Sequence, residues 1–235
     1  MAQSLEVSEK TRNTFISNVS HDLRTPITSI SGFVDGILDG VIPPEKHTYY
    51  LEIVSSEAKR LSRLVATLLE VSRIQAGERK FTLAPFDICE MARQIVISFE
   101  KKIEEKKLEV EFDLENDNMT AVADRDAIYQ IVYNLCDNAI KFSREGGLFK
   151  ISITKQKNKK LLVSVYNEGQ GISEADLPYV FERFYKSDKS RGLNKTGVGL
   201  GLYISKTIID SHGEKIWVES EQNQYCRFSF TLKCE

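Results

Sequence analysis

The sequence predicts an α+β protein: a helical hairpin that forms a four-helix bundle as a dimer, followed by a two-layer α/β sandwich. Apolar residues recur at steps of three and four over about residues 8–76. From about residue 81, short alternating segments are intermixed with helical ones. We therefore place two domains at residues 1–77 and 78–235, joined by a hinge near Gly77–Lys80.

The hairpin consists of two amphipathic helices. Apolar side chains at helical spacing run from Phe15 to Ile37 in the first helix and from Leu51 to Val71 in the second. The segment Asp39–Pro44 separates them and contains glycine and proline, which interrupt helices. A single hairpin encloses too little interior to be stable alone, so we expect its apolar stripe to be a homodimer interface.

The second domain alternates between strands and helices. Helices are expected over Ile88–Lys106, Arg125–Ser143, Ser173–Phe184 and Gly199–His212. Strands are expected over Phe81–Leu83, Leu108–Leu114, Thr120–Ala123, Phe149–Lys155, Leu161–Tyr166, Lys215–Glu219 and Arg227–Leu232. This mixture over about 150 residues indicates a two-layer sandwich.

Composition argues against several classes of protein. The formal net charge of -2 provides no basic field for nucleic acid or an anionic membrane. No run of about 18 apolar residues could span a bilayer, and no signal peptide is recognisable. Four cysteines and three histidines form no metal-binding spacing, so we expect reduced thiols in a cytoplasmic protein. The chain is expected to be soluble, with a membrane or sensor module upstream. The charged run at residues 101–107 is interpreted as a solvated helix face.

His21 is a candidate reactive side chain. It lies opposite the apolar stripe of its helix, next to Asp22 and one turn before Thr25. Pro26 lacks an N–H, so the helix is expected to bend there. A mostly neutral imidazole is a competent nucleophile, and a neighbouring carboxylate can hold its second N–H. These features alone leave an ordinary surface histidine equally open.

Three further segments have the residue types of a phosphate site. Asn134, Asn138 and Lys141 share one face of the expected helix, and amide oxygens suit Mg²⁺. Asn167 is followed by glycines at 169 and 171, which permit close approach of a planar ligand. The glycines at 197, 199 and 201 precede an apolar helix, where free amides favour phosphate. The charged segment between these glycine motifs, which begins at Lys186, is interpreted as a lid.

The segment 20–30, SHDLRTPITSI, resembles the phosphoacceptor box of sensor histidine kinases. Segments 129–143, 165–172, 180–192 and 196–203 resemble, in order, the four motifs of the ATP-binding domain that these kinases share with gyrases and a chaperone family. The resemblance covers nearly the whole chain. It implies a sensor histidine kinase core that uses ATP and Mg²⁺, phosphorylates His21 and passes the phosphoryl group to an aspartate of a response-regulator receiver domain.

The resemblance also implies roles for single residues. Asp22 would assist acid–base chemistry, and Thr25 would position water when the phospho-regulator is dephosphorylated. The remaining motif residues would bind the nucleotide. Asn138 would ligate Mg²⁺ with Asn134 near it, Lys141 and the amides near Leu200 would contact the phosphates, and Phe142 would line the adenine pocket. The other motif residues around the nucleotide would be Asn167, Gly169, Gly171, Lys186, Gly197, Gly199 and Gly201.

The chain departs from the family pattern at three positions. Asn167 replaces an aspartate that accepts a hydrogen bond from the adenine amino group. An amide oxygen can still accept, so we expect retained adenine preference with weaker binding. Glu214 replaces a glycine and is expected to affect a turn, while Lys195 stands where glycine is frequent and is expected to stiffen the lid hinge.

Three alternatives remain open on sequence grounds. A nucleotide-binding scaffold without transfer is favoured only by Asn167. A phosphatase-dominant regulator would depend on Thr25 more than on kinase turnover. A conformational ATPase of the gyrase or chaperone type would need a carboxylate base where this chain has Asn134. Whether His21 is phosphorylated within one chain or across a dimer cannot be read from the sequence.

Overall fold

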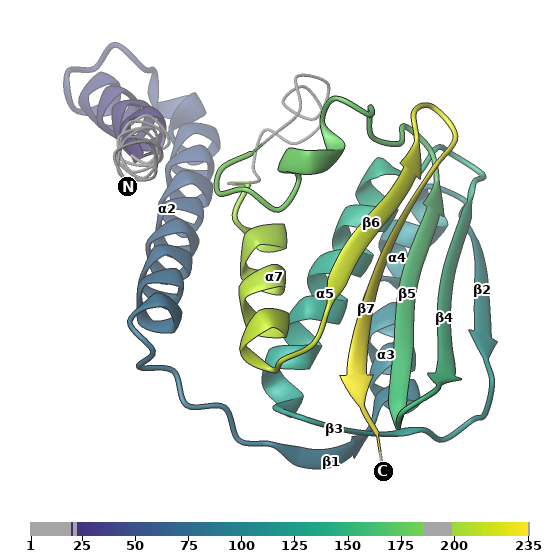
Figure 1. Cartoon of the computed structure of the whole chain (residues 1–235). Helices are drawn as coiled ribbons and strands as arrows, with labels where there is room; N and C mark the ends of the chain where they lie inside the picture. Colours follow the sequence, from purple (N-terminus) through teal and green to yellow (C-terminus); the bar gives the residue numbers. More distant parts are fainter. Residues whose placement is uncertain (1–19, 21–22, 186–198, 235) are drawn as a thin grey trace. The chain divides into compact units, whose positions relative to one another are not determined.

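The computed structural model describes residues 20, 23–185 and 199–234 (Figure 1). These residues divide into two compact units, one ending at Ala76 and one beginning at Gly77. Within the described residues, no helix is both long enough and apolar enough to cross a membrane.

The first unit is a helical hairpin. Residues 23–38 are helical, a 3₁₀ turn η1 covers Pro44–Lys46, and α2 runs over His47–Gln75. Gly40 has a φ of 68°, and its amide donates to the carbonyl of Ile37 at 3.2 Å. This left-handed residue ends the first helix, as glycine commonly does. The expected hairpin is therefore confirmed.

The second unit is a sheet covered by helices. The five-stranded sheet has the order β2-β4-β5-β7-β6, and all its pairs are antiparallel except β2–β4. Its strands are β2 (Glu109–Leu114), β4 (Leu148–Gln156), β5 (Lys160–Glu168), β6 (Ile216–Glu221) and β7 (Tyr225–Lys233). A separate pair joins β1 (Ala84–Asp87) to β3 (Thr120–Ala123).

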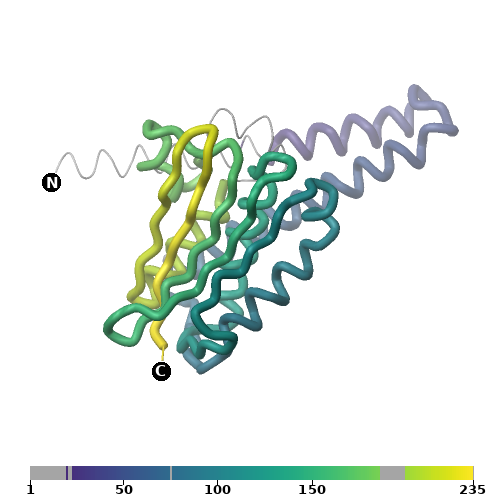
Figure 2. Tube along the Cα trace, turned by 90° about the vertical axis from the view of Figure 1, so that its right-hand side faces the viewer, coloured from purple at the N-terminus to yellow at the C-terminus, as the bar shows by residue number. Residues whose placement is uncertain are grey.

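One face of the sheet carries the helical layer (Figures 1 and 2). Its helices are α3 (Ile88–Ser98), α4 (Glu100–Glu105), α5 (Arg125–Phe142) and α7 (Gly201–Ser211). Ile131 and Leu135 of α5 are fully buried, as are Phe149 and Phe230 of the sheet. These side chains form the core between the layers, and the expected two-layer α/β sandwich is confirmed.

Three expected elements differ from the structure. The strand expected at Phe81–Leu83 is wrong, because the Thr82 amide donates to the Asp124 carboxylate at 2.9 Å and the strand begins only at Ala84. The helix expected to run continuously over Ile88–Lys106 is interrupted at Phe99. The ring of Phe99 is buried and packs on Tyr133, with the ring centroids 4.7 Å apart.

The helix expected at Ser173–Phe184 is the third difference. Only a 3₁₀ turn, η2 (Leu177–Tyr179), forms there. Ser173 and Asp176 exchange hydrogen bonds with each other, at 2.8 and 3.3 Å, which offers the backbone a turn in place of a helix.

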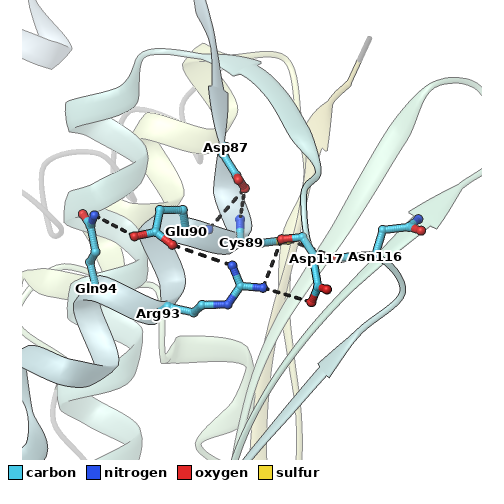
Figure 3. Close-up of polar contacts among 7 residues, drawn as sticks. All are labelled: Asp87, Cys89, Glu90, Arg93, Gln94, Asn116 and Asp117. Carbon is cyan, nitrogen blue, oxygen red and sulfur yellow. Dashed lines mark hydrogen bonds and ion pairs between the residues drawn. The ribbon is translucent and has the colours of Figure 1, made fainter.

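A polar network fixes the start of α3 (Figure 3). The Asp87 carboxylate accepts hydrogen bonds from the amides of Cys89 at 2.9 Å and Glu90 at 3.2 Å, a helix N-cap. Arg93 forms ion pairs with Glu90 at 3.7 Å and with Asp117 at 3.3 Å. These contacts tie α3 to the connection between β2 and β3.

Helix α5 begins at a second aspartate cap. The Asp124 carboxylate accepts from the amides of Ala127 and Thr82, both at 2.9 Å. Burial by itself raises the pKa of this carboxyl, but the two hydrogen bonds, together with the charges of Arg79 and His212, hold the pKa below its ordinary value. The charged cap therefore stabilises the fold above the unfolded-state pKa of about 3.9, and this contribution is lost as pH falls through the lower folded-state pKa.

We predict that Asp124→Ala lowers the free energy of unfolding by about 1–2 kcal/mol at neutral pH, because the start of α5 loses its cap. Urea unfolding measures this. The difference from the unmodified chain should shrink in acid. The matched control is Asp126→Ala, which removes an exposed carboxylate two residues further along the chain. It should change the free energy of unfolding by less than about 0.5 kcal/mol. Equal losses from both variants would contradict the capping role.

Candidate functional site

Helix α5 presents a row of three polar side chains at the edge of the helical layer. Asn134, Asn138 and Lys141 are half-buried, whereas Leu135 and Ile140 between them are buried in the core. This is the shared face that the spacing of four and three predicts. The row is therefore held in place by the packing of its own helix.

The first residue of this row contacts the start of α7. The Asn134 amide donates to the Ser205 hydroxyl at 3.1 Å, and that hydroxyl donates to the carbonyl of Gly201 at 3.0 Å. A Cβ atom at Gly201 would overlap the Asn134 side chain. Glycine at 201 is thus required for the close approach of α5 and α7. Asn134 is thereby used in positioning, and Ser205 is a residue that the sequence reading missed.

Among the described residues, no side chain caps the N-terminus of α7. The Leu200 side chain is buried at this end, 1% exposed, so the backbone is anchored from the core side. The first amides of an α-helix have no partner within the helix and favour an anion. This arrangement fits the phosphate-binding interpretation of the glycine segment.

The segment before α7 is closed by a backbone contact. The Phe184 amide donates to the Gly199 carbonyl at 2.9 Å. Gly199 has a φ of 75°, and a Cβ there would lie 2.9 Å from the carbonyl carbon of Phe184. Nearby, Arg183 donates to the Tyr203 hydroxyl at 2.8 Å and lies over that ring at 4.7 Å. These contacts join the turn containing η2 to α7.

The glycines after β5 also permit close packing within the protein. A Cβ at Gly169 would overlap the carbonyl of Phe142, and a Cβ at Gly171, which has a φ of 56°, would overlap the carbonyl of Glu221. The amide of Gln170 also donates to the Phe142 carbonyl, at 3.3 Å. Both glycines therefore permit close packing of the loop against protein backbone, and the first brings the loop to the end of α5.

Asn167 is almost fully buried at the end of β5. Its side chain is 3% exposed, and its Nδ2 atom has no hydrogen-bond partner among the described residues. An unpaired buried amide donor costs roughly 1–3 kcal/mol. Such an atom requires a partner, and a bound ligand is one group that can supply it.

Lys106 caps the other end of α5, a role that sequence reasoning missed. Its Nζ donates to three carbonyls, those of Ile140 at 2.9 Å, Lys141 at 2.6 Å and Ser143 at 3.0 Å. Burial lowers the pKa of this ammonium group, and the carbonyls compensate for its loss of water. The interpretation of residues 101–107 as a uniformly solvated face is therefore wrong at Lys106.

Glu214, which replaces a glycine of the family pattern, lies in the turn after α7, where it was expected to act. Gly213, with a φ of 70°, ends α7, and the buried Glu214 carboxylate pairs with Lys160 at 2.7 Å. His212 accepts a hydrogen bond from the Asp124 amide at 3.2 Å. These residues join the end of α7 to the sheet and to the start of α5.

His21, Asp22, Lys186, Lys195 and Gly197 lie outside the described residues. Thr25 is described and is an exposed residue of the first helix. The phosphoacceptor assignment therefore depends on the sequence, and the contacts above concern the candidate nucleotide site of the second unit.

The residues of α5 and α7 fit a nucleotide with a metal ion. Asn167 provides an unsatisfied polar group for a base, and the first turn of α7 with Lys141 provides donors for phosphate. The described residues contain no cluster of three or more metal-binding His, Cys, Asp or Glu side chains. Mg²⁺ does not need one, because it commonly takes one or two protein oxygens, substrate phosphates and water. The Asn138 amide oxygen suits that arrangement.

Family comparisons agree with this geometry. Residues 11–77 match the model of the His kinase A (phospho-acceptor) domain. Residues 123–235 match the model of the histidine kinase-, DNA gyrase B- and HSP90-like ATPase. The chain belongs to the family of sensor histidine kinases. The two matched regions follow each other in the order of a histidine kinase core.

Individual relatives support the same family. Sensor histidine kinase WalK of Bacillus subtilis is 34% identical over 97% of this chain, which spans 37% of that relative. The histidine kinase AdeS of Acinetobacter baumannii is 27% identical with a TM-score of 0.74, over 92% of this chain and 98% of that one. ThkA, solved in complex with the response regulator TrrA, is 28% identical with a TM-score of 0.73, over 99% of this chain and 66% of that one. The chain thus spans less than two fifths of the curated relative's length.

We predict that Lys106→Met lowers the free energy of unfolding by about 1.5–3 kcal/mol, because three carbonyls at the end of α5 lose a charged donor. Urea unfolding measures the loss. Lys101→Met, on the exposed side of α4, is the matched control and should stay within about 0.5 kcal/mol. If both variants were equally stable, the capping role of Lys106 would be excluded.

Proposed function

We propose that this kinase core binds ATP with Mg²⁺, phosphorylates His21 and transfers the phosphoryl group to an aspartate of a response-regulator receiver domain. The observation that carries the proposal is the polar row of α5 packed against the uncapped start of α7, in a chain whose N-terminal region matches a phosphoacceptor domain. Residues 1–77 would be the dimerisation and phosphotransfer domain, and residues 78–235 the ATP-binding domain.

Each part of the nucleotide has assigned residues in this proposal. Asn138 would ligate the metal, with Asn134 lining the site beside it. Lys141 and the amides near Leu200 would bind the phosphates. Phe142 and Asn167 would contact the base. Gly169 would set the loop after β5 against the end of α5, and Gly171 would set it against the end of β6. Lys186, Gly197, Gly199 and Gly201 would complete the phosphate side. Support comes from the contacts of α5 with α7 and with the loop after β5.

The transfer step requires little reactive chemistry from the protein. A neutral ring nitrogen of His21 attacks the γ-phosphorus, the bond to the bridging oxygen breaks, and ADP leaves with the electron pair. Asp22 holds the other ring N–H and offsets the positive charge that develops on the imidazole. Asn138 would hold Mg²⁺, which would supply positive charge to offset that of the phosphate oxygens. The remaining contribution of the chain is to position the two groups.

Phospho-His21 would then donate to a receiver-domain aspartate. The complex of the relative ThkA with the response regulator TrrA supports a partner of this class. Thr25 would position water for hydrolysis of the phospho-regulator, and its exposure on the first helix supports access by a partner. The same proposal includes a cytoplasmic location downstream of a membrane-anchored sensor module. The greater length of the relative WalK supports the presence of further modules.

The hairpin leaves apolar surface uncovered, which supports a homodimer. Ile27, Leu51, Val65 and Leu69 are between 43% and 56% exposed. Val65 and Leu69 also line a groove on the hairpin with Ile30, Ala58 and Leu61. Pairing two hairpins into a four-helix bundle would bury this surface.

We predict that His21→Gln abolishes acid-labile, base-stable labelling by γ-labelled ATP with Mg²⁺, while ATP affinity is retained. His47→Gln is the matched control in the same hairpin. The His47 ring lies 2.9 Å from the Ile42 carbonyl in the turn, so this variant should still be labelled.

Asn138→Asp should lose both Mg²⁺-dependent ATP binding and labelling. Normal activity of the Asn138 variant would exclude the assigned metal position.

We predict that Leu69→Lys shifts the chain from dimer to monomer, because it places a charge in the proposed bundle interface. Light scattering at several concentrations measures the mass. Leu83→Lys, at an exposed leucine of the second unit, is the control and should leave the dimer intact. An unchanged mass for Leu69→Lys, or a monomeric unmodified chain, would contradict the proposed interface.

A further inference from the structure

Asn167 occupies the end of a buried apolar row. Leu161, Val163 and Val165 precede it at alternate positions of β5, and each is at most 1% exposed. Alternation places Asn167 on the same face of the sheet, which the helices cover. A polar amide therefore continues a row that is otherwise entirely aliphatic.

The neighbours of Asn167 leave its amide donor unpaired. Its register partners are Phe149 on β4 and Cys226 on β7, and a phenyl ring and a thiol are poor acceptors. Burial raises the pKa of Cys226 to about 12, so this sulfur stays a neutral thiol. The result is a buried Nδ2 atom with no partner in the part of the chain that the structure describes. No described contact of that atom therefore holds the amide in one orientation.

The orientation of this amide decides which purine it can bind. A carboxylate only accepts hydrogen bonds, so it pairs with a 6-amino group and repels a 6-oxo group. An amide accepts through Oδ1 and donates through Nδ2, and rotation about χ2 exchanges the two. With Nδ2 buried, Oδ1 is left to accept from a 6-amino group, but a donor is orphaned. After rotation, Nδ2 can donate to a 6-oxo group, and Oδ1 takes the buried position instead, so one buried atom is unpaired in either orientation.

We propose that Asn167 binds the substituent at the purine 6 position either as acceptor, through Oδ1, or as donor, through Nδ2. The site would then take 6-oxopurine nucleoside triphosphates as well as ATP. This inference rests on the proposed nucleotide site and concerns which bases that site admits. It identifies Asn167 as the residue that sets base selectivity. With aspartate at this position the chain would discriminate strongly against 6-oxopurines, because two acceptors would face each other.

Inosine triphosphate is the direct probe, because it carries a 6-oxo group in place of the 6-amino group of ATP and lacks the 2-amino group of guanine. The dissociation constants of ATP and inosine triphosphate are measured with Mg²⁺ on the full chain, by competition against a fluorescent nucleotide. For the unmodified chain we expect the two values to agree within about tenfold. For Asn167→Asp we expect tighter ATP binding, weaker inosine triphosphate binding and a ratio at least about 100-fold larger.

The outcomes separate this inference from the proposed function. Suppose that the unmodified chain binds ATP normally but binds inosine triphosphate more than about 100-fold more weakly. The proposed binding of 6-oxopurines would then be overturned, and the nucleotide site would stand. Absence of ATP binding would overturn both.

A third nucleotide keeps the test independent of the variant, should the buried aspartate prevent folding. Purine riboside triphosphate has no 6-substituent, so it can form no hydrogen bond at that position. On the unmodified chain, both ATP and inosine triphosphate should bind more tightly than this analogue. If the analogue bound as tightly as inosine triphosphate, Asn167 would not contact the 6 position and the inference would fail.

Discussion

Helix α5 must present two incompatible surfaces, and the rest of the second unit depends on how it does so. Its apolar side packs on the sheet, while Asn134 and Asn138 remain half-buried at the edge of the layer. Asp124 and Lys106 fix the two ends of the helix through hydrogen bonds to its unpaired backbone groups. A shift of α5 by one residue would bury the polar row and break both caps.

The other motifs are assembled around this helix. Gly201 lets the start of α7 approach Asn134, and Gly169 lets the loop after β5 approach the Phe142 carbonyl. Both contacts would be lost with any larger residue. These glycines permit close packing within the chain, and this packing brings the start of α7 and the loop that follows Asn167 to the same helix, α5.

Local periodicity predicted most of the fold, because apolar spacing along α5 and alternation along β5 reflect burial directly. It failed where a tertiary contact overrides local preference. Thr82 donates to Asp124 and so leaves the expected first strand, and Phe99 turns into the core and breaks the long helix. The polar site row was predictable from spacing, and Ser205 could have been found four residues after Gly201. Lys106 could not, since its three carbonyl partners lie more than thirty residues away.

The central claim is that the nucleotide held by the second unit gives its terminal phosphoryl group to a histidine of the hairpin. The most direct measurement is mass spectrometry of the unmodified chain after incubation with Mg²⁺ and ATP, with digestion at neutral or basic pH to preserve phosphohistidine. The account predicts a single phosphoryl group, carried by the peptide that contains His21. An unmodified chain, or a phosphoryl group on another side chain, would contradict it.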